Sequence, residues 1–101
     1  MEVKPGTRLR SVADATEIIV VKAPKADVDL RCGGHPMAPI DAPPGDAPVA
    51  SGFDQGTLIG KRYAHDRAGL EVLCTVPGAG ALSVGPELLE LKQAKALPSS
   101  D

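Results

Sequence analysis

The sequence predicts a small, mostly β single domain over residues 1–101, built as a β-barrel or sandwich of about 6–8 short strands. With 101 residues, 43% of them hydrophobic, the chain is long enough for one domain with one core. Runs of β-branched or alternating apolar residues recur along it, separated by turns that contain proline and glycine. Phe53 and Tyr63 are the only aromatic residues, so we expect an aliphatic core.

Four segments carry the strand signal. TEIIVV (16–21) is continuous and β-branched, which predicts a strand buried on both faces. VDLRC (28–32) alternates and GLEVLCTV (69–76) alternates in part, so each should bury one face. ALSV (81–84) is a short apolar run that follows a turn. The segments APKAD and PGAG, one in each half of the chain, are interpreted as turns between strands.

The two halves of the chain also begin alike, with GTRLRS at 6–11 and GTLIGKR at 56–62. A shift of 50 residues aligns the two Gly-Thr pairs, and a three-residue insertion then brings Pro24 onto Pro77 and IIVV onto VLCT in part. This pattern predicts an internal duplication of about 45 residues, with two hairpin-like halves around a pseudo-twofold axis. Chance similarity between two β-hairpins is the alternative.

These halves should cover about 6–34 and about 56–92. Residues 35–56 between them hold half of the ten prolines and three aspartates. Prolines this dense remove backbone donors and prevent a helix, so the segment is predicted to be an extended surface loop. Phe53 is expected to anchor the far end of this loop to the core.

The C-terminal residues 86–97 allow two interpretations. Pro86 followed by helix-forming residues suits the start of a helix. The alternation of apolar and charged residues favours a short strand at about 88–92 instead, as the duplication does. Residues 93–101 are expected to form a flexible tail.

The composition argues against several classes of partner. A formal net charge of −2 disfavours nucleic acid, because such binding depends on clustered Lys and Arg. No stretch approaches the roughly 20 apolar residues that span a bilayer, and the first residues lack the apolar run of a secretory signal. We therefore expect a cytoplasmic protein with two reduced thiols, no membrane association, and a protein partner or a homo-oligomer.

The segment DLRCGGHPMAP (29–39) places a thiol, an imidazole and a thioether within six positions. Cys32 and His35 have the spacing with which one turn presents two zinc ligands, and His65 and Cys74 would have to complete a tetrahedral set. Copper(I) would use Cys32 and Met37, because soft sulfur ligands prefer that ion. The candidate metal site for zinc or copper is thus Cys32, His35, Met37, His65 and Cys74, although the absence of any cofactor is the simpler expectation.

The same residues have a simpler interpretation. Cys32 and Cys74 lie on apolar strand faces, where free cysteines act as small buried hydrophobic residues. A redox-responsive pair of these two cysteines is an alternative. A nucleophilic Cys32 with His35 as its base is a third, but the spacing selects no orienting carboxylate, so the catalytic residues stay unknown.

Three functions are compatible with this sequence. The first is a non-catalytic accessory or binding subunit, which associates with itself or docks on a larger protein. A chain this small buries only a modest fraction of its surface alone, so association would stabilise it. The second is a small metal-binding or redox-responsive protein that uses the Cys32–Met37 turn with Cys74. The third is a small-molecule enzyme whose reaction the sequence does not name.

Overall fold

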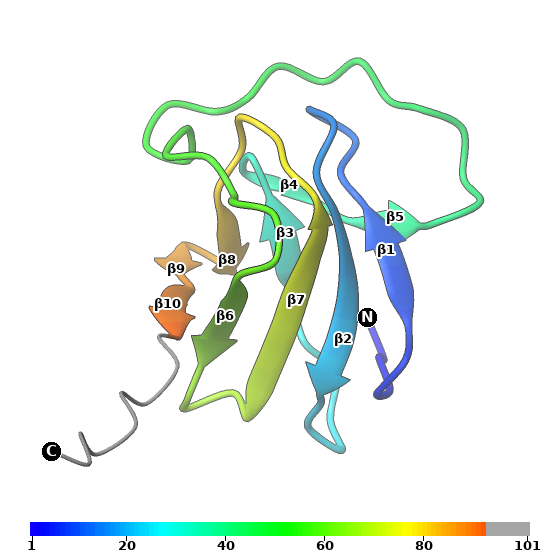
Figure 1. Cartoon of the computed structure of the whole chain (residues 1–101), viewed down its shortest axis with the longest axis vertical. Coiled ribbons are helices and arrows are strands. Elements are labelled where there is room, and N and C mark those ends of the chain that lie inside the picture. Colours follow the sequence, from blue (N-terminus) through cyan, green and yellow to red (C-terminus); the bar gives the residue numbers. More distant parts are fainter. Residues whose placement is uncertain (93–101) are drawn as a thin grey trace, which may run out of the picture.

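The computed structural model of the protein describes residues 1–92, which fold into ten strands arranged as two antiparallel sheets (Figure 1). The mostly β prediction is confirmed, and the two separate sheets are not a closed barrel. No helix within residues 1–92 is long and apolar enough to cross a membrane. The strands are β1 (Arg8–Arg10), β2 (Glu17–Lys22), β3 (Leu30–Cys32), β4 (His35–Pro36), β5 (Ala38–Pro39), β6 (Arg62–His65), β7 (Leu70–Val76), β8 (Leu82–Val84), β9 (Glu87–Leu88) and β10 (Glu90–Lys92).

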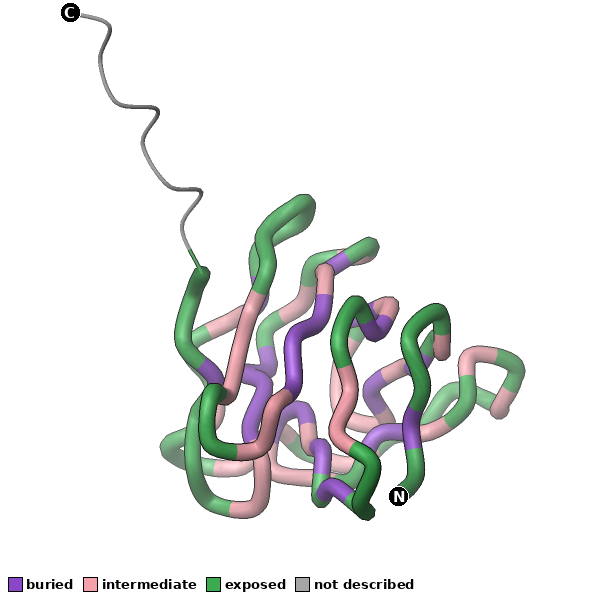
Figure 2. Tube along the Cα trace, turned by 90° about the horizontal axis from the view of Figure 1, so that it is seen from below, coloured by how far each residue is buried: buried purple, intermediate pink, exposed green. Residues whose placement is uncertain are grey.

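The six-stranded sheet has the order β10-β6-β7-β2-β1-β5, and the four-stranded sheet has the order β4-β3-β8-β9. The inward faces of both sheets and the segments beside them contribute to one core, and buried residues gather in the interior of the molecule (Figure 2). As expected, this core is aliphatic with sulfur: Val3, Leu9, Ile18, Val20, Val28, Leu30, Cys32, Met37, Leu70, Val72, Leu82 and Leu89.

The chain passes between the sheets at two equivalent points. Met37 lies between β4 and β5, and its N–H donates to the Leu30 carbonyl at 3.1 Å. Leu89 lies between β9 and β10, and its N–H donates to the Leu82 carbonyl at 2.9 Å. Both side chains are buried, so each passage also closes one side of the core.

The strand pairing has a pseudo-twofold symmetry. Arg8 faces Ile19 in the β1–β2 pair, and Arg62 faces Leu73 in the β6–β7 pair, 54 residues later. The β2–β7 pair brings Ile19 opposite Leu73, so these two residues are each other's counterpart at its centre. In the four-stranded sheet the offset is 52 residues: Cys32 pairs with His35, as Val84 does with Glu87. Such pairing is what the predicted pseudo-twofold axis requires.

The alignment predicted from the Gly-Thr pairs is wrong by four residues at its start. Gly6 donates its N–H to the Val20 carbonyl at 2.7 Å, and its structural counterpart Gly60 donates to the Cys74 carbonyl at 2.9 Å. Gly6 therefore corresponds to Gly60 and not to Gly56. The partial match of IIVV (18–21) with VLCT (72–75) agrees with the observed offset of 54 residues, but at this offset the counterpart of Pro24 is Gly78 and not the predicted Pro77.

Three further expectations are corrected or confirmed. The strand predicted at 16–21 buries one face only: Ile18 and Val20 are 1% exposed, but Val21 is 39% exposed. Val21 lies where the β2–β7 pairing shifts register between Val20 and Lys22, so it has no partner residue on β7. The strand count exceeds the predicted 6–8 because two-residue strands form around Met37 and Leu89. The strand alternative for the C-terminus is correct as far as Lys92, and the tail predicted at 93–101 lies outside the described residues.

The predicted loop begins later than expected, because residues 35–39 form β4 and β5. From 40 to 56 the chain contains no strand and arches over one end of the sheets (Figure 1). It is tied down at intervals: Ala47 N–H donates to the Val12 carbonyl at 3.1 Å, and Ala81 N–H donates to the Phe53 carbonyl at 2.9 Å. The predicted anchoring near Phe53 is thus a backbone contact with the residue that precedes β8.

Candidate functional site

Cys32 ends β3 with its thiol fully buried. Its Sγ donates to Asp14 Oδ1 at 3.6 Å. Burial, and then the negative charge of Asp14, raise the pKa of the Cys32 thiol to about 12. The protonated thiol is a poor nucleophile, which agrees with the position of Cys32 as a buried core residue.

Asp14 is the centre of a polar cluster at the end of the sheets. Its Oδ2 accepts hydrogen bonds from Thr16 Oγ1 at 2.6 Å and from the Gly80 N–H at 2.7 Å. Burial alone would raise the pKa of Asp14, but hydrogen bonds from Ser11, Thr16, Gly80 and Cys32 together hold it below its ordinary value. The cluster joins the turn before β2 to the turn before β8, and its polar groups satisfy one another.

Cys74 lies within β7, opposite Ile18. Its Sγ donates to the Val76 carbonyl at 3.2 Å, and burial raises the pKa of the thiol. Both cysteines are buried and free of a disulfide. The interpretation of Cys32 and Cys74 as small buried hydrophobic residues therefore agrees with their positions.

His35 ties the proline-rich loop to β4. Its Nε2 lies 2.7 Å from the Pro48 carbonyl oxygen. A carbonyl can only accept, so Nε2 carries a proton and donates. Met37, two residues on, is 4% exposed and packs in the core between the sheets.

His65 ends β6 and lines a small hollow of about 280 Å³ at the side of the molecule. Its Nδ1 accepts the Ala68 N–H at 3.1 Å, so Nε2 carries the proton and donates to Glu87 Oε1 at 2.9 Å. Arg67 pairs with the other oxygen of Glu87, and hydrogen bonds from Arg67 and then His65 lower the pKa of Glu87. With both ring nitrogens engaged, His65 has no free lone pair for proton abstraction or for a metal.

The structure does not bring the five candidate metal ligands together. Cys32, Cys74 and Met37 are buried, His35 faces the proline-rich loop, and His65 faces Glu87. Within residues 1–92, no three His, Cys, Asp or Glu side chains lie close enough together to hold a metal ion. The metal hypothesis therefore gains no support from the geometry.

The two halves of the molecule differ at their sheet edges, a feature that sequence reasoning missed. Strands β4 and β5 form the edges of the first half, and β9 and β10 form those of the second (Figure 1). Pro36 and Pro39 occupy β4 and β5, where their structural counterparts in β9 and β10 are Leu88 and Leu91. Each of these two leucines is 41% exposed.

The hydrogen bonds show which way these edge residues face. Ile40 N–H donates to the Arg8 carbonyl of β1 at 3.2 Å. Backbone groups point alternately to the two sides of a strand, so the backbone nitrogen of the neighbouring Pro39 points away from β1. The missing N–H of proline therefore breaks no hydrogen bond within the sheet. The counterpart of Pro39 on β10 is Leu91, which lies opposite Tyr63. The backbone of Leu91 also points away from the neighbouring strand, and Leu91 does carry an N–H there. The first half therefore blocks its edge of the six-stranded sheet, whereas no strand within residues 1–92 pairs with the free edge of the second half.

The same holds for the four-stranded sheet. The backbone hydrogen bond from Met37 to Leu30 means that the backbone nitrogen of Pro36 in β4 points to the free edge. In the same way, the hydrogen bond from Leu89 to Leu82 means that the N–H of Leu88 in β9 points to the free edge. Exposed edges with free N–H groups are sites where further strands pair, and proline is a common means of preventing it. We call the surface formed by β9 and β10 the open edge.

A turn beside the open edge is also apolar. Leu58 and Ile59, in the turn that precedes β6, are 57% and 62% exposed. Leu58 N–H donates to Tyr63 Oη at 2.9 Å, and Tyr63 faces Leu91 across the sheet, so the turn is linked to β10. The counterparts of Leu58 and Ile59 in the first half are Lys4 and Pro5, because Lys61 N–H bonds Leu58 as Thr7 N–H bonds Lys4.

Comparison with known proteins finds no family model that matches the chain, and no curated protein or solved structure matches it at a significant level.

Proposed function

We propose that this protein is a non-catalytic binding module, an accessory subunit that attaches to another protein chain through the open edge and the adjoining Leu58–Ile59 turn. The observation that carries the proposal is the contrast between the halves. Four large apolar residues are exposed in the second half, and the first half has lysine or proline at every equivalent position. The residues concerned are Leu58, Ile59, Leu88 and Leu91, with Lys4, Pro5, Pro36 and Pro39 as their counterparts.

The energetics favour a partner at this surface. Complete burial of a leucine or isoleucine side chain contributes about 1.5–3 kcal/mol. The four side chains are about half exposed, so covering them would contribute roughly 4 kcal/mol per chain on the same scale. Exposed apolar patches beside an unpaired strand are typical of protein interaction sites.

The chemistry of the polar residues also supports a binding role. Burial raises the pKa of both thiols, so neither is primed as a nucleophile. The ring of His65 is held between the Ala68 amide and Glu87, and the Nε2 of His35 is bound to a loop carbonyl. These groups hold the fold together, which leaves the open edge as the feature without a structural role of its own.

Photo-crosslinking tests this proposal with matched positions. The photoreactive residue p-benzoylphenylalanine is placed at position 88 or 91, and at the counterpart position 36 or 39, in the organism that encodes the chain. We expect protein adducts from positions 88 and 91 and none from 36 and 39. Adducts of equal yield at all four positions, or at none, would contradict a binding role for the open edge.

A further inference from the structure

We infer that the partner at the open edge is a second copy of this chain, paired strand to strand through β10 about Leu91. The inference rests on the proposed function and specifies its partner. An antiparallel pair of β10 strands places Leu91 opposite Leu91 of the second copy and joins the two six-stranded sheets into one.

The backbone supports this register. Tyr63 faces Val72 in the β6–β7 pair, and β7 directs alternate residues to β6, beginning with the Cys74 bonds to Gly60 and Lys61. The backbone groups of Tyr63 therefore point to β7, and those of its β10 partner Leu91 point to the free edge. In the dimer each Leu91 N–H would donate to the Leu91 carbonyl of the other copy, giving two hydrogen bonds.

The charges are complementary to themselves in this register. Glu90 and Lys92 flank Leu91 and share the outward face of the sheet. Antiparallel pairing about Leu91 puts Glu90 of each copy opposite Lys92 of the other, at the close separation of a non-hydrogen-bonded pair. Lys92 already donates to Glu71 Oε1 at 2.7 Å, which holds its ammonium over the sheet, and its remaining protons can serve a second carboxylate.

Pairing through β10 also closes the six-stranded sheet at two copies. The opposite edge of the six-stranded sheet is β5, where Pro39 supplies no outward N–H. A β10–β10 contact is isologous and closes on itself, so the joined sheet ends in two blocked edges. This accounts for the placement of proline on one half of a symmetric molecule and leucine on the other.

Sedimentation equilibrium on the full chain tests the inference, over protein concentrations up to about 1 mM. We expect a concentration-dependent mass that approaches twice the monomer's 10.4 kDa. Leu91→Pro copies the residue of the first half, so it should fold and raise the dimer dissociation constant at least tenfold. Val21→Thr, which removes an exposed apolar residue elsewhere and copies Thr75, should leave the constant unchanged.

Charge reversal isolates the register from mere hydrophobic contact. Glu90→Lys and Lys92→Glu each place like charges opposite one another and should weaken the dimer about tenfold. The double variant exchanges the charges across the contact, and because a glutamate at position 92 then faces Glu71 it should recover part of the lost affinity relative to each single variant. Circular dichroism confirms folding for each variant.

A monomeric wild-type chain at every concentration, or a dimer that Leu91→Pro and the single charge reversals leave intact, would overturn the inference. Photo-crosslinks from positions 88 and 91 to a heavier, different chain would then leave the proposed function standing while refuting self-pairing. The absence of any crosslink would refute the proposed function itself.

Discussion

Replacing Asp14 by alanine should be among the most damaging single changes to this fold. The Asp14 carboxylate accepts hydrogen bonds from Thr16 Oγ1 and the Gly80 N–H, and a weaker one from the Cys32 thiol. Thr16 is 0% exposed and Gly80 is buried, whereas Asp14 is half-buried, so water entering its place would satisfy these donors only in part. Asp14→Ala therefore leaves two buried donors without their protein partner.

The magnitude follows from those two donors. Each buried donor left unsatisfied costs about 1–3 kcal/mol, so the two together give roughly 3 kcal/mol. Domains of this size unfold with a free energy of about 5–15 kcal/mol, so the change removes a large share of the stability. Thr16→Val removes one of the two donors, and it should reduce the cost of a subsequent Asp14→Ala change.

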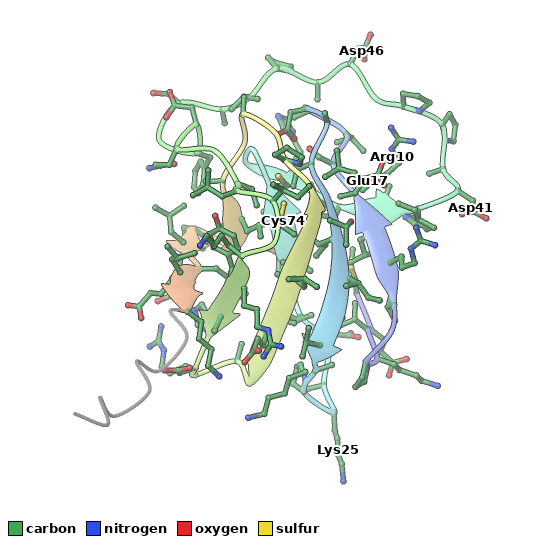
Figure 3. All side chains as sticks on the ribbon, viewed as in Figure 1. Arg10, Glu17, Lys25, Asp41, Asp46 and Cys74 are labelled. Carbon is green, nitrogen blue, oxygen red and sulfur yellow. The ribbon has the colours of Figure 1, made fainter. Side chains whose placement is uncertain are left out.

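Urea unfolding at pH 7 measures the loss. Asp46→Ala is the control, because Asp46 lies on the exposed arch of the loop and points away from the sheets (Figure 3). This control should change the free energy of unfolding by less than about 0.5 kcal/mol. Equal effects of the two substitutions would refute the role assigned to the Asp14 cluster.

The pH dependence gives a second readout for Asp14. Its pKa is lowered in the folded state, so its carboxylate contributes stability above the unfolded-state pKa, and this contribution is lost as pH falls through the lowered value. The difference between wild type and Asp14→Ala should therefore be full at pH 7 and shrink below about pH 4. A difference that does not change with pH would show that the charge of Asp14 is not involved.

The remaining predictions concern the thiols and the outer face of the six-stranded sheet. At pH 8 Cys32 should react with iodoacetamide about 1,000-fold more slowly in the folded than in the unfolded chain, because its pKa is about 12. Mass spectrometry of quenched samples measures the two rates. Reaction of the folded chain at the unfolded rate would contradict the burial of Cys32. Glu71→Gln should cost about 1 kcal/mol at pH 7, because the Glu71 side chain is 7% exposed and pairs with Lys92 and Arg62. Hydrogen bonding to Lys92 lowers the pKa of Glu71, so this cost should shrink as pH falls through that lowered pKa. A cost that stays constant over the whole acid range in which the chain is folded would show another cause.

Local patterns predicted four of the ten strands, because alternation reports which face of a strand is buried. β3, β7 and β8 fall within the segments identified in the sequence, and β2 extends one residue beyond its segment, to Lys22. The equivalence of the halves was predicted in outline, but the Gly-Thr match misplaced its start. Gly6 and Gly60 are equivalent because they donate hydrogen bonds to the Val20 and Cys74 carbonyls. An alignment of residue identities does not contain this information.

The candidate sites depended more on tertiary structure. Cys32 and His35 are close in sequence, but the Cys32 side chain lies in the core and the His35 ring contacts the Pro48 carbonyl of the loop. Side chains of nearby residues on a strand and turn point in different directions. The hydrogen bond of His65 to Glu87 joins residues 22 positions apart and was not predicted. No sequence pattern indicates this hydrogen bond, because only the packing of β6 beside β9 and β10 brings His65 and Glu87 together.

The sequence by itself determined the β class and the aliphatic core, because these depend on residue type and short-range periodicity, and it predicted two similar halves without deciding between duplication and chance. Tertiary structure alone decided which residues stand on free edges. Pro36, Pro39, Leu88 and Leu91 are ordinary strand-end residues until the sheet order makes β4, β5, β9 and β10 the outermost strands. Only then does the presence or absence of one outward N–H separate a closed half from an open one.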